Sequence, residues 1–291
     1  MALLKKVTDE ELASLKGKTI IITGGGSGIG KAAANLAYAA GANIVIADLS
    51  NDVGASLSKE FPERMIFVKA DVSKWSEVLD IFKKTWDHFG AIDVVLSNAG
   101  THAFETLHDE TLDDDGYPIA PSLKSFEVNL HSAAYCTKAA VHFFKKQPQK
   151  KCQLVFTGSA ASLIDTPPLY LYCAGKAGVL GLMRGMRLGL PSDNMSVNMV
   201  APWMTVTPAM PDWIKEKWGE LPTNDTVGVA KALLLPAIRT HTNGKTLWVA
   251  GNDIVEIEDA LHEAQPQWLG AKLSADVDEG QLRLGIGASN K

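Results

Sequence analysis

Residues 18–30, KTIIITGGGSGIG, join a short β-branched run to a glycine-rich turn. A helical pattern follows over residues 31–40, and Gly41 stands where a C-terminal cap is expected. A second apolar run, residues 43–47, stops at Asp48. A strand, a glycine turn, a helix, a second strand and an acid within about thirty residues form the context that a dinucleotide-binding turn requires. The stretch therefore predicts an α/β fold that opens with a βαβ unit.

The glycine turn and the acid also predict which ligand binds. Glycines let the backbone turn tightly and approach a pyrophosphate, whose charge rests on the N-terminus of the following helix. Asp48 can hydrogen-bond both hydroxyls of an adenosine ribose and would repel a 2′-phosphate. Lys31 is basic, but it follows the last glycine on the helix and is expected to face solvent. NAD is therefore the expected cofactor, and the alternative is a glycine-rich turn without a ligand.

A second informative stretch is residues 169–176, LYLYCAGK. In a helix, Tyr172 and Lys176 are one turn apart on the same face. A free phenol titrates near roughly 10, and a fixed ammonium beside it favours the phenolate. A tyrosine tuned in this way could remove a proton from an alcohol. Tyr170 has no lysine four residues on and is expected to be pocket wall. Taken alone, the pattern is also compatible with a surface helix pair.

Gly24, Gly28 and Gly30 stand at offsets of four and then two. Together with the tyrosine and the lysine, this spacing resembles the short-chain dehydrogenase/reductase family. Further motifs in compatible order extend the resemblance over residues 17–252. The resemblance implies a cofactor site of Gly24, Ser27, Gly28, Ile29, Gly30, Asp48, Asp71, Val72, Asn98, Ala99, Gly100, Tyr172, Lys176, Pro202, Thr205 and Thr207.

The resemblance also implies a catalytic group of Asn129, Ser159, Tyr172 and Lys176. Ser159 would orient the substrate oxygen, and Tyr172 would take the hydroxyl proton while a hydride moves to the nicotinamide. Lys176 would hold the nicotinamide ribose and lower the pKa of the tyrosine. Asn129 would position the water of a proton relay. Considered singly, Ser159 could be a turn residue and Asn129 a surface residue.

Two positions depart from the family pattern. Gly175 stands before the lysine, where the family usually has serine, so one cofactor contact is weakened and a poor helix former lies beside the site. Trp203 stands after Pro202, where the family usually has glycine, and its ring is expected to narrow or reshape the pocket near the nicotinamide. Neither change removes a group that the chemistry requires.

Apolar runs alternate with helical patterns along the chain, which predicts a doubly wound, Rossmann-like parallel sheet of seven strands with helices on both faces. This single domain, residues 17–252, lies between an N-terminal extension, residues 1–16, and a C-terminal tail, residues 253–291. The expected strands are residues 20–24, 43–48, 65–70, 93–98, 153–158, 196–201 and 246–250. In such sheets ligands lie outside the carboxyl ends of the strands, where many of the expected site residues stand.

Residues 203–226 contain prolines, tryptophans and methionines and are expected to form a substrate lid. Ile214 and Trp218 are spaced i,i+4 on a short helix with Met210 one turn earlier, and together with Trp213 they are expected to cover the substrate. Methionines and aromatic rings suit a bulky hydrophobic ligand of irregular shape. The alternative is a stripe packed permanently on the core.

The chain has 291 residues, a formal net charge of −5 and 46% hydrophobic residues. It has no basic stripe, so a nucleic-acid partner is not expected. No stretch approaches ~18 uncharged apolar residues and the N-terminus has no apolar signal region, so we expect a cytoplasmic protein without a membrane partner. Cys136, Cys152 and Cys173 follow no ligand spacing and are expected to be structural thiols. No metal is expected, because the histidines lack partners at ligand spacing.

Together, the residues and the resemblance imply an NAD-dependent short-chain alcohol dehydrogenase that oxidises a secondary alcohol to a ketone. The resemblance points to fungal secondary-metabolite enzymes, so a bulky polyketide or terpenoid alcohol is the expected substrate. The reverse ketone reduction, a non-oxidative isomerase or cyclase using the same tyrosine, and a non-catalytic NAD-binding regulator stay open.

The resemblance further implies a homodimer or homotetramer packed through the helices that carry Asn129 and Tyr172. Small residues on both helices would permit close approach between copies; the alternative is that they pack on their own sheet. These small residues are Ala133, Ala134, Ala140, Gly178, Gly181 and Gly185.

Overall fold

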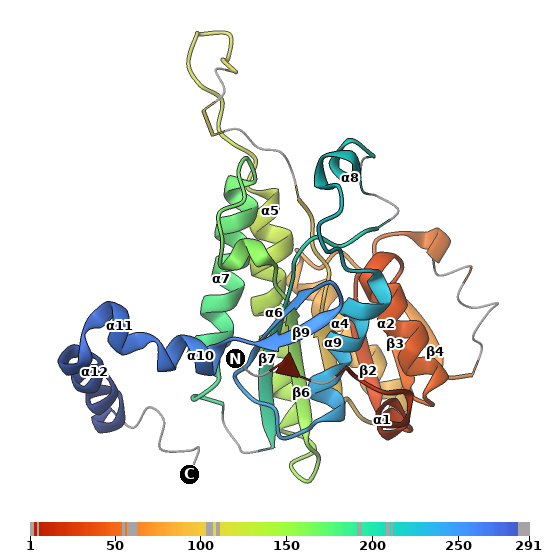
Figure 1. Cartoon of the computed structure of the whole chain (residues 1–291). Helices are drawn as coiled ribbons and strands as arrows, with labels where there is room; N and C mark the ends of the chain where they lie inside the picture. The colour runs from red at the N-terminus through yellow and green to blue at the C-terminus, as the bar shows by residue number, and fades with distance from the viewer. Residues whose placement is uncertain are drawn as a thin grey trace.

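The computed structural model describes residues 3–4, 6–53, 56, 63–102, 107–108, 111–190, 194–207, 210 and 212–284. Over these ranges the chain forms one nine-stranded sheet in the order β1-β9-β8-β7-β6-β5-β2-β3-β4 (Figure 1). The seven predicted strands pair in parallel: β2 Thr19–Thr23, β3 Asn43–Asp48, β4 Met65–Lys69, β5 Val94–Ser97, β6 Cys152–Thr157, β7 Met195–Pro202 and β8 Thr246–Ala250. The predicted α/β fold is confirmed.

Two further strands enlarge the predicted sheet of seven. β9, Asp253–Glu256, pairs antiparallel with β8, and β1, Leu3–Leu4, pairs antiparallel with β9. Gly251 and Asn252 have φ angles of 59° and 63°, and positive φ at both central residues suits a tight hairpin turn. The ranges assigned to the extension and the tail therefore each contribute a strand to the edge of the sheet. Glycine followed by asparagine was the available sequence signal for this hairpin.

The order of strands reverses between β2 and β5. β3 and β4 lie on one side of β2, whereas β5 to β8 extend the sheet on the other side. In open parallel sheets, ligands bind at this reversal, outside the carboxyl ends of the strands. Gly24 follows β2 and Asn98 follows β5, so both residues flank that point.

Helices cover both faces of the sheet (Figure 1). One face carries α2, Gly28–Ala39, and α9, Thr226–Ile238, which pack on each other and on the strands. The opposite face carries three helices: α4, Trp75–Phe89, α6, Ser132–Phe144, and α7, Tyr170–Met186. The central strands are thus buried on both sides, which explains why they are continuous hydrophobic runs in the sequence.

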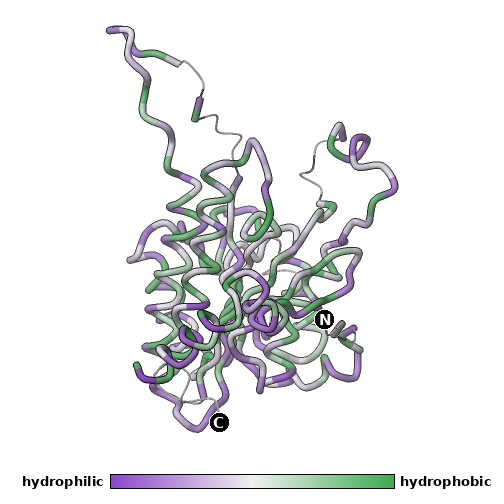
Figure 2. The backbone as a smooth tube through the Cα atoms, turned by 60° about the vertical axis from the view of Figure 1, so that its left-hand side comes forward, coloured by the Kyte–Doolittle hydropathy of each residue, from purple (hydrophilic) through white to green (hydrophobic). Residues whose placement is uncertain are grey.

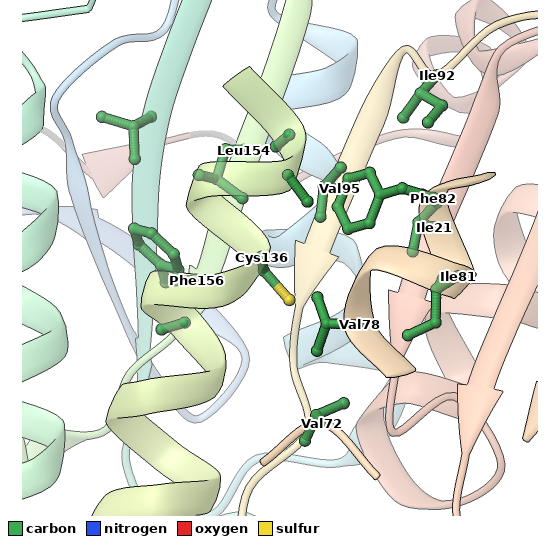
Figure 3. Close-up of a cluster of buried hydrophobic side chains, with 14 of the residues drawn as sticks. Ile21, Val72, Val78, Ile81, Phe82, Ile92, Val95, Cys136, Leu154 and Phe156 are labelled. Carbon is green, nitrogen blue, oxygen red and sulfur yellow. The ribbon is translucent and has the colours of Figure 1, made fainter. Parts of the chain in front are cut away.

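The core under α4 and α6 is closely packed. Figure 3 shows Ile81 and Phe82 of α4 and Cys136 of α6 gathered around Ile21 of β2 and Val95 of β5. All five side chains are fully buried. Burial raises the pKa of the Cys136 thiol to about 12, which agrees with a structural role for this cysteine.

Shorter elements complete the chain. They are α1, Asp9–Leu12, the 3-10 turn η1, Ala13–Leu15, α5, Lys124–Phe126, the π-helical turn η2, Glu127–His131, the 3-10 turn η3, Ala160–Ser162, α8, Asp212–Trp218, α10, Glu258–Glu263, α11, Gln265–Leu269, and α12, Ala271–Arg283. Figure 1 shows α10 to α12 as an arm beside the end of α7. Figure 2 shows α8 and the segment around residues 111–120 projecting from the body. None of the helices in the described ranges is long and apolar enough to cross a membrane.

A buried carboxylate fixes the C-terminal arm to α7. The side chain of Glu258 is 5% exposed, and its Oε2 lies 3.0 Å from Arg184 Nε and 2.9 Å from Arg187 Nη1. Thr246 Oγ1 donates a hydrogen bond to Glu258 Oε1 at 2.8 Å. These bonds join α10 to the end of α7 and to β8.

Candidate active site

The glycine turn after β2 leaves no room for a side chain at Gly24 or Gly30. Gly24 has a φ of 65°, and a Cβ at this position would lie 2.9 Å from the Cα of Ala99. A Cβ on Gly30 would collide with the carbonyl oxygen of Gly24 and lie 2.7 Å from Asn98 Nδ2. The turn therefore packs directly on the end of β5. The resulting cradle fits a dinucleotide that approaches the backbone closely.

Helix α2 begins at the same cradle. Its first residue is Gly28, and Ser27 is the N-cap residue with an extended backbone. The Ser27 side chain makes no capping hydrogen bond within the described part of the chain. The first N–H groups of α2 are therefore available to an anionic ligand. Ile29 is half-buried against the core and anchors this first turn.

The Asp48 carboxylate lies beside the turn, where the sequence predicts it. Its Oδ2 accepts a hydrogen bond from Gly26 N–H at 3.0 Å, and its Oδ1 accepts one from Ser50 N–H at 3.3 Å. A Cβ on Gly26 would lie 2.8 Å from Oδ2. A half-buried carboxylate held at this place disfavours a phosphate group next to it.

Asp71 and Val72 follow β4. The Asp71 carboxylate accepts hydrogen bonds from the hydroxyl and the N–H of Ser73 at 2.6 and 3.0 Å, and these bonds hold its pKa below the usual value. Asp71 N–H donates to Glu77 Oε2 at 2.7 Å, a partner that sequence reasoning missed. The Val72 side chain is buried in the core (Figure 3), so only its backbone can face a ligand.

Asn98 joins the ends of three strands. Its N–H and that of Ala99 both donate to Thr23 Oγ1 at 3.0 Å. Its Nδ2 donates to the carbonyl oxygens of Thr23 and Gly24 at 3.0 and 3.3 Å, and its Oδ1 accepts from Thr157 Oγ1 at 3.1 Å. β2, β5 and β6 are thereby locked together at the site. Thr23 and Thr157 were not predicted, although each is the last residue of its strand.

Ser159, Tyr172 and Lys176 come together at the end of β6. Ser159 follows that strand, and its hydroxyl accepts a hydrogen bond from Ala161 N–H at 3.1 Å. It also lies close enough to the Tyr172 phenol, on the first turn of α7, to lower the pKa of that group. Lys176 Nζ lies 5.7 Å from the centre of the Tyr172 ring and donates to the Thr157 carbonyl oxygen at 2.8 Å. The structure therefore assembles a hydroxyl, a phenol and an amine in the predicted order.

Asn129 lies in η2, a π-helical turn of the kind often found at functional sites. Its Nδ2 donates to the Thr101 carbonyl oxygen at 2.7 Å and to Ser125 Oγ at 3.1 Å, and its Oδ1 accepts from Thr101 N–H at 3.1 Å. A Cβ on Gly100 would lie 2.9 Å from Asn129 Oδ1 and 3.3 Å from Lys176 Nζ. Asn129 therefore fixes the chain after β5 beside the lysine, through partners that were not predicted.

Gly175 lies buried in α7 beside Asn129. A Cβ at this position would lie 3.7 Å from Asn129 Cβ, an ordinary contact. The helix runs through Gly175 without interruption from Tyr170 to Met186. The departure from serine therefore leaves the geometry of the site intact.

Burial dominates the pKa values of the tyrosine and the lysine. Burial raises the pKa of Tyr172, and the Ser159 side chain opposes this with a smaller effect. Burial lowers the pKa of Lys176 to about 8. The expected lowering of the Tyr172 pKa by the lysine is therefore not found here. The Lys176 ammonium is directed at the Thr157 carbonyl oxygen, and the Lys176 side chain is buried.

The lowered pKa of Lys176 predicts a pH-dependent stability. The unfolded chain keeps the lysine proton up to the usual pKa of 10.5, whereas the folded chain loses it near 8. Unfolding then takes up a proton, so the free energy of unfolding should rise between these two pH values by ~3 kcal/mol. Denaturant unfolding of the wild type and of Lys176→Met at a series of pH values measures this rise. The variant should lack it, and equal slopes in both proteins would contradict the assignment.

The segment after β7 is tied back to the sheet. Pro202 ends the strand, and the Thr205 hydroxyl donates to the Trp203 carbonyl oxygen at 2.9 Å. Asn224 Nδ2 donates to Thr205 Oγ1 at 3.4 Å. Thr207 is half-buried two residues further on. The predicted residues Pro202, Thr205 and Thr207 thus lie on one segment at the carboxyl edge.

Trp203 holds helix α8. Its ring meets the Trp218 ring edge-on with centroids 4.8 Å apart, and Trp218 Nε1 donates to the Pro222 carbonyl oxygen at 3.2 Å. Trp203 therefore anchors the lid, a role that its sequence position alone did not indicate. Trp213 is 52% exposed and lies over Lys217, with Nζ 5.6 Å from the ring centre. Trp213 thus faces solvent, whereas the sequence predicts that it covers the substrate beside the stripe of Met210, Ile214 and Trp218.

The remaining stripe agrees with a lid more than with core. Met210, Ile214 and Trp218 are half-buried, and α8 has no buried residue along its described length. Of the prolines in this segment, Pro208 and Pro211 lie outside the described residues.

Two histidines lie against the tyrosines of α7. The His102 and Tyr172 ring centroids are 6.5 Å apart, and the His108 and Tyr170 centroids are 5.7 Å apart, both edge-on. These contacts make them candidates for substrate contact that sequence spacing could not indicate. In the described ranges, no group of three or more His, Cys, Asp or Glu residues could hold a metal ion.

Comparisons with known proteins agree with this geometry. A family model described as short chain dehydrogenase matches residues 18–218. The chain is 31% identical over 284 residues to short-chain dehydrogenase/reductase prx4 of Penicillium roqueforti, covering 91% of this chain and 84% of the relative. It is 31% identical over 221 residues to 5′-hydroxyaverantin dehydrogenase of Dothistroma septosporum, covering 69% and 71% of the two chains.

Solved structures show the same fold. The 3-ketoacyl-(acyl-carrier-protein) reductase from Brucella melitensis, complexed with NADH, matches with a TM-score of 0.71 at 22% identity, covering 81% of this chain and 98% of that one. The NADPH-dependent 3-quinuclidinone reductase from Rhodotorula rubra matches with a TM-score of 0.70 at 25% identity, covering 87% and 97%. The chain therefore belongs to the short-chain dehydrogenase/reductase family of nicotinamide-dependent oxidoreductases.

Proposed function

We propose that the protein oxidises a secondary alcohol to a ketone with NAD. The observation that carries this proposal is that Ser159, Tyr172 and Lys176 meet at the carboxyl edge of the sheet, with Lys176 Nζ 5.7 Å from the centre of the Tyr172 ring. The glycine turn has no room for a side chain at Gly24 or Gly30, and the start of α2 offers N–H donors, so a nicotinamide dinucleotide fits. The turn and Asp48 would hold its adenosine half, and Lys176 its nicotinamide ribose.

The side chains divide the chemistry between them. When bound, the nicotinamide supplies the hydride acceptor. The Ser159 hydroxyl holds the substrate oxygen next to the phenol, and Tyr172 takes the proton from that oxygen. Because burial raises the pKa of Tyr172, its phenolate needs a cation nearby, and Lys176 is placed to supply that charge. Asn129 keeps the chain around Thr101 in place next to the lysine.

The substrate that we propose is a bulky hydrophobic alcohol of secondary metabolism, such as a polyketide or terpenoid. The half-buried stripe of Met210, Ile214 and Trp218 supports an apolar ligand under the lid. The relatives prx4 and 5′-hydroxyaverantin dehydrogenase come from fungi, and the second is named as a dehydrogenase of a hydroxylated compound. These names support an alcohol of that metabolism as the substrate.

Incubation with NAD and a panel of secondary alcohols, from isopropanol to polycyclic alcohols, tests the proposal. Absorbance of the reduced cofactor measures the rate, and we expect it to form with bulky alcohols and far more slowly with isopropanol. Conversion of substrate without reduced cofactor would instead indicate an isomerase or cyclase. Binding of NAD without turnover of any alcohol or ketone would indicate a regulator.

Asp48→Ala should erode the preference for NAD. We expect the wild type to prefer NAD over NADP about tenfold or more in kcat/KM, because the carboxylate binds ribose hydroxyls and repels a 2′-phosphate. The variant should lose most of this ratio, and kinetics with both cofactors measure it. Asp52→Ala, which removes an exposed acid nearby, is the matched control and should keep the ratio. Equal wild-type kinetics with NADP would contradict the argument.

Trp203→Gly should loosen the lid. The change removes the ring that meets Trp218, so we expect KM for a bulky alcohol to rise about tenfold while kcat changes little. Steady-state kinetics with a small and a bulky alcohol measure this, and the effect should be larger for the bulky one. The control Trp213→Ala removes an exposed ring and should leave KM unchanged. A KM that rises for Trp213→Ala and not for Trp203→Gly would reverse the roles of the two rings.

We also propose that the protein is a homodimer or homotetramer packed through α6 and α7. Ala134, Gly181 and Gly185 are exposed on these helices, and Cβ atoms on the two glycines would meet open space. Ala133 and Ala140 instead are buried in the core under α6. These two residues therefore pack on their own sheet, which was the alternative to contact between copies. Light scattering at micromolar concentration tests the proposal, and a monomer would refute it.

A further inference from the structure

A cleft lies between α4 and α6, and none of its lining residues belongs to the proposed active site. Its volume is about 390 Å³, and its apolar lining comes from Leu79, Trp86, Ala139 and Phe143, with Trp75 near the start of α4. Trp75 and Trp86 are separated by three helical turns, so the cleft follows α4 for roughly 16 Å. The volume is within the range of small-molecule sites, which are mostly apolar with a few polar groups.

Lysine side chains border this apolar floor. Lys83 from α4, Lys138 from α6 and Lys146, two residues after the end of α6, line the cleft together with His142, against one carboxylate, Asp87. On a chain with a formal net charge of −5, these three lysines are a local concentration of positive charge. Such a rim favours an anion over a neutral or cationic ligand.

The lysines of the cleft differ from the neighbouring Lys84 in that they form no ion pair within the described residues. Lys84, one residue further on α4, pairs with Asp80 at 2.7 Å. Lys83, Lys138 and Lys146 pair with no carboxylate in the described part of the chain. Lys146 Nζ instead lies over aromatic rings of the cleft, at 4.6 and 5.4 Å from their centres. The positive charge of Lys146 therefore lies directly on the apolar surface that Trp86 and Phe143 form.

We infer that this cleft binds an amphipathic organic anion, with an apolar body and a terminal carboxylate or sulfonate. The apolar body would lie on Leu79, Trp86 and Phe143 and lose its contact with water. The anionic group would meet Lys138 and Lys146 at the rim. A neutral ligand of the same length gains only the burial of its apolar body. The anion should therefore bind more tightly than the neutral ligand.

Calorimetric titration of the full-length protein with decanoate and with decanol, its neutral match, tests the inference. We expect decanoate to bind about tenfold or more tightly than decanol. Lys138→Glu combined with Lys146→Glu should remove most of this difference and leave the affinity for decanol unchanged. The matched control combines Lys84→Glu with Lys145→Glu, which change the net charge equally at two lysines outside the cleft lining. It should bind decanoate and decanol as the wild type does.

Several results would overturn the inference. Equal wild-type affinity for decanoate and decanol would show that the rim does not select charge, and equal losses in both double variants would place the anion elsewhere. Loss of alcohol turnover in the cleft variant alone would mean that decanoate reports on the active site. A change of molecular mass in the cleft variant and not in the control would identify the cleft as an interface between copies.

Discussion

Tyr172→Phe is expected to lower turnover by ~100-fold or more, with little change in the affinity for NAD. The substitution keeps the ring and removes only the hydroxyl, whose pKa the neighbouring Ser159 lowers. Because the ring stays packed, the cradle at the glycine turn and the position of Lys176 should be unchanged. Steady-state kinetics with a bulky secondary alcohol, and titration of the variant with NAD, measure the two effects separately.

Tyr170→Phe is the matched control for this prediction. Tyr170 precedes Tyr172 by two residues, so it lies on nearly the opposite face of α7. It is 37% exposed and has the His108 ring as its neighbour. Removal of its hydroxyl should leave turnover close to that of the wild type. If Tyr172→Phe kept more than about a tenth of wild-type turnover, or if Tyr170→Phe lost as much, the phenol of Tyr172 would not be the base.

Gly30→Ala is expected to abolish most of the binding of NAD. An added Cβ would collide with the carbonyl oxygen of Gly24 and lie 2.7 Å from Asn98 Nδ2. Neither group can move without a large cost in free energy, because the Gly24 carbonyl is backbone and the Asn98 amide is held by hydrogen bonds to β2 and β6. The turn must therefore shift away from β5, and we expect the Kd for NAD to rise by about a hundredfold, measured by calorimetry.

The control for Gly30→Ala is the same substitution at Gly181 in α7. A Cβ there would meet open space, so alanine should leave the affinity for NAD unchanged and should add some helical stability. Thermal unfolding of both variants without NAD separates a local effect on the turn from general unfolding. Wild-type affinity in Gly30→Ala would show that the cradle is not as tight as the contacts indicate.

The strands and the glycine turn could be predicted because their signals are local. Each β-branched run, and the glycines between the first run and α2, depends on backbone preferences that act over a few residues. The hairpin of Gly251 and Asn252 also had a local signal, yet β9 is short and β1 has two residues, so neither shows the length or alternation typical of a strand. Pairing at the sheet edge, which is long-range, defines both.

The places of the site residues along the chain could be predicted from the sequence, but their hydrogen-bond partners and the shifts of their pKa values could not. The sequence by itself determined the α/β order, the carboxyl edge as the site, and the placing of Asp48, Ser159, Tyr172 and Lys176 along it, because strand ends and helical spacing are local properties. Only the tertiary structure decided which partners hold them, such as Thr157 for the lysine, since such residues are distant in sequence. It also decided the direction of both pKa shifts, because the loss of water that drives them exists only once the chain has packed.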